Sequence, residues 1–185
     1  MKSILKGVVA FLLLLYPVAI FFGISFFEPR FLTLFLLVVI LVRFLSTTNV
    51  KFGAKGIERT LLIFSIILIC IAFFNNSIIA LKLYPVLINT SLLFVFLISL
   101  KFPPTAIERL ARLKEPDLPP EGVSYTRKVT IVWSVFFSLN GLAALYTAMY
   151  TEIEIWTLYN GLISYILMGA LFGSEWIYRR YYLKG

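Results

Sequence analysis

Histidine is absent from this chain of 185 residues, and cysteine and aspartate occur once each, as Cys70 and Asp117. Without histidine, the chain lacks the commonest general base and the commonest metal ligand of proteins. A single cysteine excludes a disulfide bond within the chain. No residues have the spacing of metal ligands, no glycine-rich phosphate loop occurs, and no nucleophile has a base beside it in sequence. We therefore predict no catalytic residues, no metal and no cofactor.

Charged residues are also scarce. They make up 14% of the chain, whereas soluble domains average roughly a quarter. Hydrophobic residues make up 61% and aromatic residues 17%. A soluble domain of this length has too little interior to bury so much apolar surface, so lipid must solvate it. We predict an all-α integral membrane protein that forms a single domain over residues 1–185.

Six apolar runs are candidates for transmembrane helices, each of which needs about 20 residues to cross a bilayer. The second run is short and needs its flanking residues to span; otherwise the first two runs form a re-entrant hairpin. Tyr-Pro pairs at Tyr16–Pro17 and Tyr84–Pro85 are either simple kinks or marks of an inverted repeat. The six runs cover residues 7–27, 31–45, 57–74, 78–100, 129–150 and 155–178.

Positive charge is distributed unevenly along this topology. The net charge is +8, and only Arg30 and Lys82 lie on the side that carries few basic residues. The positive-inside rule then places both termini in the cytoplasm. Because the basic residues flank apolar runs, they suit lipid head groups, and we predict no nucleic acid partner. The other side carries Lys2, Lys6, Arg43, Lys51, Lys55, Arg59, Lys101, Arg109, Arg112, Lys114, Arg127, Lys128, Arg179, Arg180 and Lys184.

The loop between the fourth and fifth predicted spans, residues 101–128, contains the stretch "TAIERLARLK". Thr105 and Glu108 have the spacing of a capping box, and Pro116 should end the helix that it starts. The following "EPDLPP" favours an extended path to the fifth span. The helix is predicted to be amphipathic, with one apolar face of Ala106, Ile107, Leu110, Ala111 and Leu113.

Two interpretations of this helix remain open. It lies flat in the membrane interface with its apolar face toward the lipid, or it is a docking surface for a cytosolic partner or an anionic lipid head group. The candidate contact residues of the docking interpretation are Glu108, Arg109, Arg112, Lys114, Arg127 and Lys128.

Polar side chains also occur inside predicted spans. The motif "NGL" places Asn140 and Asn160 in the fifth and sixth spans, and Asn89 lies in the fourth. Hydrogen bonds between helices are one interpretation; a polar pocket for a lipid or isoprenoid head group is the other. Glu175 lies near the inner surface, where Arg179, four residues further on, is positioned to pair with it.

Gly169 and Gly173 form a GxxxG motif in the last span, which permits close approach of two helices. Packing within the chain is the favoured interpretation and dimerisation the alternative. The sequence does not predict an oligomeric state.

The carboxy-terminal half, about residues 101–180, resembles a known family. The pattern "FPPTAIERLARLKEPDLPPEGVSYTRKVTIVWSVFFSLNGL", followed by "LYNGLISYILMGALFGSEWIYRR", is similar to small bacterial inner-membrane proteins of aryl-polyene gene clusters, which contain type II fatty-acid-synthase-like genes. More remotely, the arrangement resembles the intracellular septation protein A family. The resemblance implies a multi-span protein of the bacterial inner membrane that is linked to envelope synthesis. It brings no catalytic residues, and the first half and the "NGL" pairs depart from the septation pattern.

These observations predict a non-enzymatic accessory or scaffold protein for the synthesis of envelope lipids or polyene lipids. Its basic loop would recruit inner-membrane or cytosolic biosynthetic proteins, including an acidic carrier protein. The alternative is a carrier or flippase for a lipid-linked product, in which the three asparagines line a polar path. A membrane transferase is a third class, with no visible catalytic machinery.

Overall fold

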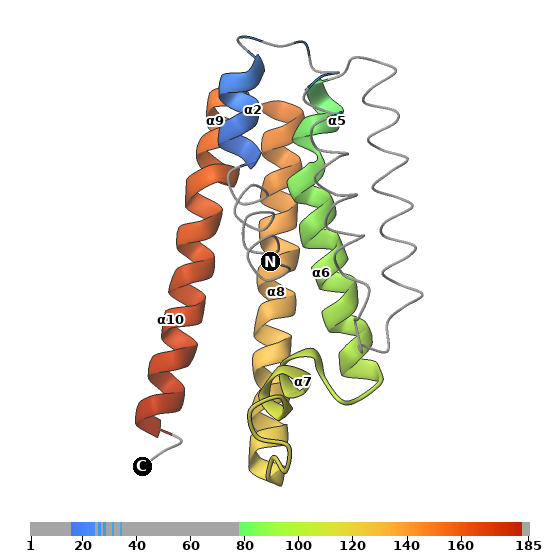
Figure 1. The fold of residues 1–185 in the computed structure, drawn as a ribbon, viewed down its shortest axis with the longest axis vertical. Coiled ribbons are helices and arrows are strands. Elements are labelled where there is room, and N and C mark those ends of the chain that lie inside the picture. The colour runs from blue at the N-terminus through green and yellow to red at the C-terminus, as the bar shows by residue number, and fades with distance from the viewer. Residues whose placement is uncertain are drawn as a thin grey trace, which may run out of the picture. The chain divides into compact units, whose positions relative to one another are not determined.

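The computed structural model describes residues 16–24, 26, 28, 31, 34 and 78–182 of the chain, and the secondary structure that it describes is entirely helical (Figure 1). The predicted all-α class is therefore confirmed for this part of the chain. The predicted spans 31–45 and 57–74, and most of 7–27, lie outside it. The helices are α2 (Tyr16–Ile24), α5 (Ile78–Lys82), α6 (Tyr84–Lys101), α7 (Ala106–Arg112), α8 (Pro120–Tyr150), α9 (Ile153–Leu158), the π-helix η1 (Tyr159–Ile163) and α10 (Ser164–Tyr182).

Three helical stretches are long and apolar enough to cross a membrane. They are Tyr84–Lys101, Pro120–Tyr150 and Ile153–Arg180. These stretches correspond to the predicted spans 78–100, 129–150 and 155–178. The structure thus confirms helices of the required length and composition at the last three predicted spans.

The fourth predicted span is interrupted by its proline. Helix α5 ends at Lys82, Leu83 forms a turn, and α6 begins at Tyr84, one residue before Pro85. Proline has no amide hydrogen and its ring clashes with the carbonyl group four residues earlier, so a continuous helix is disfavoured here. The Tyr84–Pro85 pair therefore divides this run into two helices.

The contacts divide the chain into two compact units, which we describe separately. Unit 1 comprises residues 1–85 and 144–165, and unit 2 comprises residues 86–143 and 166–185. Helix α8 supplies residues to both units.

The core of unit 2 forms around one stripe of α8. Val129, Trp133 and Phe137 recur every four residues on this helix and are buried. The ring of Phe137 meets Phe96 of α6 edge to face at 5.1 Å, and Trp133 meets Phe172 of α10 at 5.7 Å. Edge-to-face aromatic pairs of this kind add to the stabilisation from apolar burial. Partly buried side chains around this stripe are Leu92, Leu93, Phe96, Ile107, Tyr125, Phe136, Met168 and Leu171.

Helix α8 begins earlier than the sequence predicts. We expected an extended path from Pro116 to the fifth span, but the helix starts at Pro120 and includes residues 120–128. Proline is well tolerated in the first turn of a helix, and Glu121 there favours the helix dipole. Within the predicted loop, residues 102–105 and 113–119 remain outside the helices.

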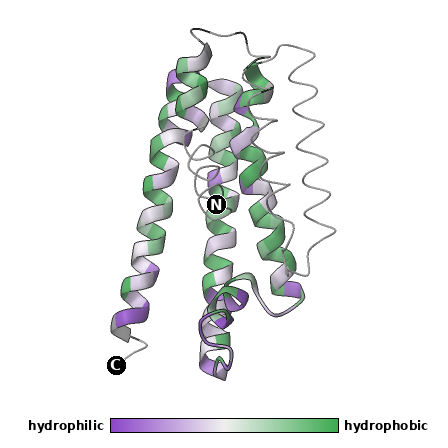
Figure 2. Cartoon of the chain, viewed as in Figure 1, coloured by the Kyte–Doolittle hydropathy of each residue, from purple (hydrophilic) through white to green (hydrophobic). Residues whose placement is uncertain are grey.

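Hydrophilic residues of unit 2 gather on α7, on the first turns of α8 and at the carboxy-terminal end of α10, whereas α6 is mostly hydrophobic (Figure 2). Within this unit, α7 lies beside the early turns of α8 (Figure 1). This polar segment coincides with the predicted loop 101–128.

In unit 1, η1 packs against α2. A Cβ atom added to Gly161 would lie 3.3 Å from Val18 Cγ2 and 3.5 Å from Pro17 Cβ. The absence of a side chain at this position therefore permits the two backbones to approach closely. Ile20, Leu81 and Trp156 are fully or almost fully buried in this unit.

Candidate functional site

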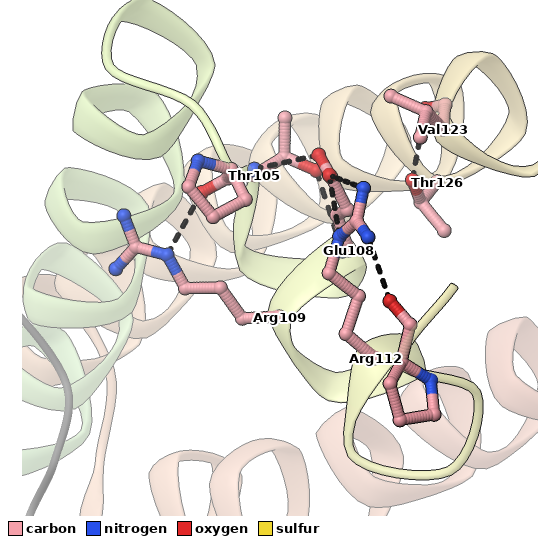
Figure 3. A network of polar contacts seen from close by, with 8 residues as sticks. Thr105, Glu108, Arg109, Arg112, Val123 and Thr126 are labelled. Atoms are coloured by element: carbon pink, nitrogen blue, oxygen red, sulfur yellow. Dashed lines mark hydrogen bonds and ion pairs between the residues drawn. The ribbon is translucent and has the colours of Figure 1, made fainter. Parts of the chain in front are cut away.

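The amino terminus of α7 forms the predicted capping box (Figure 3). Thr105 Oγ1 accepts a hydrogen bond from the Glu108 amide at 3.3 Å, and Glu108 Oε2 accepts one from the Thr105 amide at 3.2 Å. Both residues are buried, with exposed fractions of 2% and 5%. The predicted N-cap and its partner are confirmed. Helix α7 also ends at Arg112, before Pro116, as the sequence predicts.

The amides of the two residues between Thr105 and Glu108 are bound by side chains of neighbouring helices. The Ala106 amide donates to Ser99 Oγ of α6 at 2.9 Å, and the Ile107 amide donates to Thr130 Oγ1 of α8 at 3.4 Å. Ser99 and Thr130 are buried. The first amides of a helix normally lack partners inside it, and here each has an oxygen from a side chain. The helix is therefore fastened to both α6 and α8, and its amino terminus offers no free amide to an anion.

The arginines of α7 bind the loop segments on either side of the helix (Figure 3). Arg109 Nε donates to the Pro104 carbonyl at 2.8 Å. Arg112 donates to Glu108 Oε1 at 2.9 Å and to the Pro116 carbonyl at 2.8 Å. Arg112 thus joins the capping carboxylate to the loop that follows the helix. These contacts join α7 to Pro104 on one side and to Pro116 on the other.

The remaining candidate contact residues lie at the surface. Arg127 is exposed and donates to the Leu100 carbonyl at 3.0 Å. The side chains of Lys114 and Lys128 are exposed and make no hydrogen bond or ion pair with the part of the chain that the structure describes. The structure therefore brings Glu108, Arg109 and Arg112 into one network and leaves the two lysines outside it.

The apolar face of α7 differs from the predicted one. Ile107 packs against the aromatic core of unit 2, but Leu110 and Leu113 are 53% and 75% exposed. Glu108, expected on a charged face, is buried instead. The physical reason is that the helix turns its capped end toward Ser99 and Thr130, which places the Ile107–Glu108 side inward. The expectation of one shared apolar face was wrong.

The asparagines of unit 2 bind each other. Asn140 Nδ2 donates to Asn89 Oδ1 at 3.0 Å, and both residues are buried. A Cβ atom at Gly141 would lie 3.2 Å from Asn89 Cβ, so the glycine permits the close approach that this hydrogen bond requires. This bond agrees with the first of the two interpretations of these asparagines, hydrogen bonds between helices.

Asn160 lies in unit 1, in the π-helix η1, and has different partners. Its Nδ2 donates to Thr147 Oγ1 at 3.2 Å and to the Trp156 carbonyl at 2.9 Å. Trp156 Nε1 donates in turn to the Lys82 carbonyl at 3.0 Å, and Lys82 Nζ donates to the Thr151 carbonyl at 2.7 Å. Sequence analysis missed this buried role of Lys82. No local pattern indicated it, because its partner, the Thr151 carbonyl, lies 69 residues further along the chain.

Glu175 forms the predicted ion pair with Arg179, at 3.7 Å from Nε to Oε1. It also accepts a hydrogen bond at 3.1 Å from the hydroxyl group of Tyr125, which stacks on Tyr178 with a centroid distance of 6.0 Å. The partnership with Tyr125 was not predicted, because fifty residues separate the two positions. A carboxylate with two partners is well suited to fastening α8 to α10.

The GxxxG glycines lie in open space. A Cβ atom at Gly169 or Gly173 would meet nothing within 4 Å. The packing within the chain that we favoured for this motif is not found among residues 78–182. The dimerisation alternative remains a hypothesis.

The described residues contain no group of three or more histidine, cysteine, aspartate or glutamate side chains that could hold a metal ion. Together with the three apolar helices, the geometry defines a helical protein whose composition suits a membrane and whose main polar feature is the fastened α7 segment.

No family model, curated protein or solved structure matches the chain. The resemblance of residues 101–180 to inner-membrane proteins of aryl-polyene clusters therefore stays a prediction.

Proposed function

We propose that this protein is a six-span scaffold of a bacterial inner membrane, with both termini in the cytoplasm, that recruits soluble proteins of lipid synthesis to the membrane. Three described helices have the length and composition for spanning, and 15 of the 17 basic residues fall on one side of the six-span topology. The recruiting element is the segment 101–128. Its partner is an acidic soluble protein, of which an acyl carrier protein is the leading candidate.

The observation that carries this proposal is the way in which α7 is held. Its first three amides, its capping carboxylate and both of its arginines have partners within the chain. A polar segment fixed in this way meets a partner without first losing conformational freedom, which makes association less costly.

The charges of this segment also suit an acidic partner. The acid Glu108 is buried and paired with Arg112, so it contributes no free negative charge. Arg127 and Lys128 lie exposed on the first turns of α8, and Arg109 has only one exposed hydrogen bond, to Pro104. Complementary charge accelerates association and selects partners, even where it adds little to affinity.

The test is native extraction of the tagged protein into polymer nanodiscs, followed by mass spectrometry of all that travels with it. The variant Arg109→Glu with Lys128→Glu removes one half-buried and one exposed cation and should abolish recovery of a stoichiometric acidic partner. The matched control, Glu115→Gln with Asp117→Asn, changes exposed acids of the same segment and should retain the partner.

Two results would contradict the scaffold proposal. One is recovery of the same partner from the charge-reversed and the wild-type protein. The other is recovery of a specific lipid-linked product without any protein, lost when Asn89, Asn140 and Asn160 are replaced by leucine. The second result would favour the carrier or flippase instead.

A further inference from the structure

Three large apolar side chains in and beside α7 are exposed. Phe102 is 60% exposed, Leu110 is 53% exposed and Leu113 is 75% exposed. They lie within a segment that is otherwise polar, and they face away from the core that Ile107 joins. Exposed leucines on a short, firmly held helix suggest a contact outside the fold.

The position of α7 along its neighbours indicates what that contact is. Its amides bind Ser99, two residues before the end of α6, and Thr130, one residue inside the predicted span 129–150. At this level, the apolar parts of α6 and α8 give way to polar residues. The helix therefore lies where the hydrocarbon core of a membrane would meet its head groups.

Basic residues flank the apolar group. Lys101 precedes Phe102, with Nζ 5.6 Å from the centre of the Phe102 ring, and Lys114 directly follows Leu113. Both lysines are exposed. Lysine side chains beside apolar groups characteristically extend their ammonium groups to the lipid phosphates. The charge of the flanks is thus complementary to a lipid surface.

We propose that Phe102, Leu110 and Leu113 insert into the inner interface of the membrane that the chain itself spans, with Lys101 and Lys114 on the phosphate groups. The inference rests on the membrane location in the proposed function, but not on the recruitment of a partner. It assigns Lys114 to lipid and leaves Arg109, Arg127 and Lys128 for the soluble protein.

Site-directed spin labelling tests this inference on the full-length protein in nanodiscs of phosphatidylethanolamine and phosphatidylglycerol. After Cys70→Ser, single cysteines are introduced by Leu110→Cys and Leu113→Cys, and each is labelled. Asp117→Cys supplies a control in the loop, and Leu139→Cys supplies one on the exposed apolar side of α8. The measured quantity is the ratio of accessibility to oxygen, which concentrates in lipid, over accessibility to a water-soluble nickel chelate.

We expect the ratio of oxygen to nickel-chelate accessibility at Leu110 and Leu113 to be well above the ratio at Asp117. It should approach the ratio at Leu139. Adding Lys101→Glu with Lys114→Glu should shift the Leu113 ratio toward the aqueous value. Aqueous ratios at both leucines, with a lipid-like ratio at Leu139, would overturn the inference and leave the membrane location intact.

Other results are equally decisive. Labels shielded from both reagents would show that a protein covers the face, and would overturn the inference in favour of a protein contact. An unchanged Leu113 ratio after charge reversal would remove the lysines from the lipid contact. An aqueous ratio at Leu139 would contradict the membrane location itself.

Discussion

Glu108 shows how a single acidic residue is made compatible with burial. Removing a carboxylate from water is costly unless hydrogen bonds and an opposite charge replace the water. Glu108 accepts from the Thr105 amide and from Arg112, whose side chain is 37% exposed. The carboxylate therefore acts as the central link between the start of α7 and the loop at Pro116. The role of Glu108 is structural, and the exposed cations remain the groups available to a partner.

Replacing the cap should open this segment. In Thr105→Ala, the Glu108 amide loses its acceptor, and we expect a loss of about 1 kcal/mol, or roughly a fivefold rise in the opened population. Limited trypsin digestion after Lys114, in nanodiscs, measures that population. Ser124→Ala alters an exposed side chain ten residues from the cleaved bond and should leave the cleavage rate unchanged. Equal rates for Thr105→Ala and wild type would show that the cap does not hold the segment.

The asparagine pair should behave as a coupled unit. Asn89→Leu and Asn140→Leu each break the hydrogen bond that joins α6 to α8, so each should destabilise the protein. A double-mutant cycle, measured by thermal unfolding in detergent, should give a coupling energy of about 0.6–1.7 kcal/mol. Strictly additive effects would mean that the bond contributes nothing to holding the two helices.

At the scale of elements, α8 is the longest helix that the structure describes. Its 31 residues correspond to about 46 Å at 1.5 Å per residue, whereas the hydrocarbon core is only about 30 Å thick. The helix therefore has enough length to cross the membrane and to extend beyond it by several turns. Helix α7 is fastened to the amino-terminal third of α8, through the hydrogen bond from the Ile107 amide to Thr130.

Glycines on two helices should respond in opposite ways to alanine. In Gly141→Ala the new methyl group would lie 3.2 Å from Asn89 Cβ, and Asn89 cannot retreat without straining its bond to Asn140. We expect a loss of stability. In Gly169→Ala the methyl group meets open space, and the better helix former should leave stability unchanged or raise it by up to about 1 kcal/mol.

Thermal unfolding of both glycine variants in the same detergent provides the comparison. A destabilised Gly169→Ala protein would contradict the open environment of that glycine. If its destabilisation appeared only at high protein concentration, where chains associate, the dimerisation alternative for the GxxxG motif would gain support.

At the scale of the whole molecule, the sequence predicted features that depend on neighbours along the chain. The Thr105–Glu108 box and the Glu175–Arg179 pair each join residues three or four positions apart, and such spacing is read directly from a helix. Apart from the bond between the asparagines of two spans, contacts between distant segments were inaccessible, because no local pattern specifies that Thr130 accepts from Ile107. The buried side of α7 was misassigned for the same reason: residues on α6 and α8 decide which face turns inward.

The transmembrane topology was likewise only partly predictable from local patterns. Apolar run lengths predict spans, and the structure describes helices of suitable length for the last three of them. The orientation of these helices stays a prediction from the charge distribution. That assignment determines whether segment 101–128 is able to meet a cytosolic protein at all.

Cysteine accessibility in intact cells tests this central claim most directly. In a Cys70→Ser background, Asp117→Cys and Glu152→Cys place single thiols in the α7–α8 loop and in the turn between α8 and α9. A membrane-impermeant maleimide should label Glu152→Cys in intact cells, and Asp117→Cys only after the inner membrane is opened. Labelling of Asp117→Cys in intact cells, with Glu152→Cys protected, would reverse the topology and contradict the proposed recruitment of cytosolic proteins.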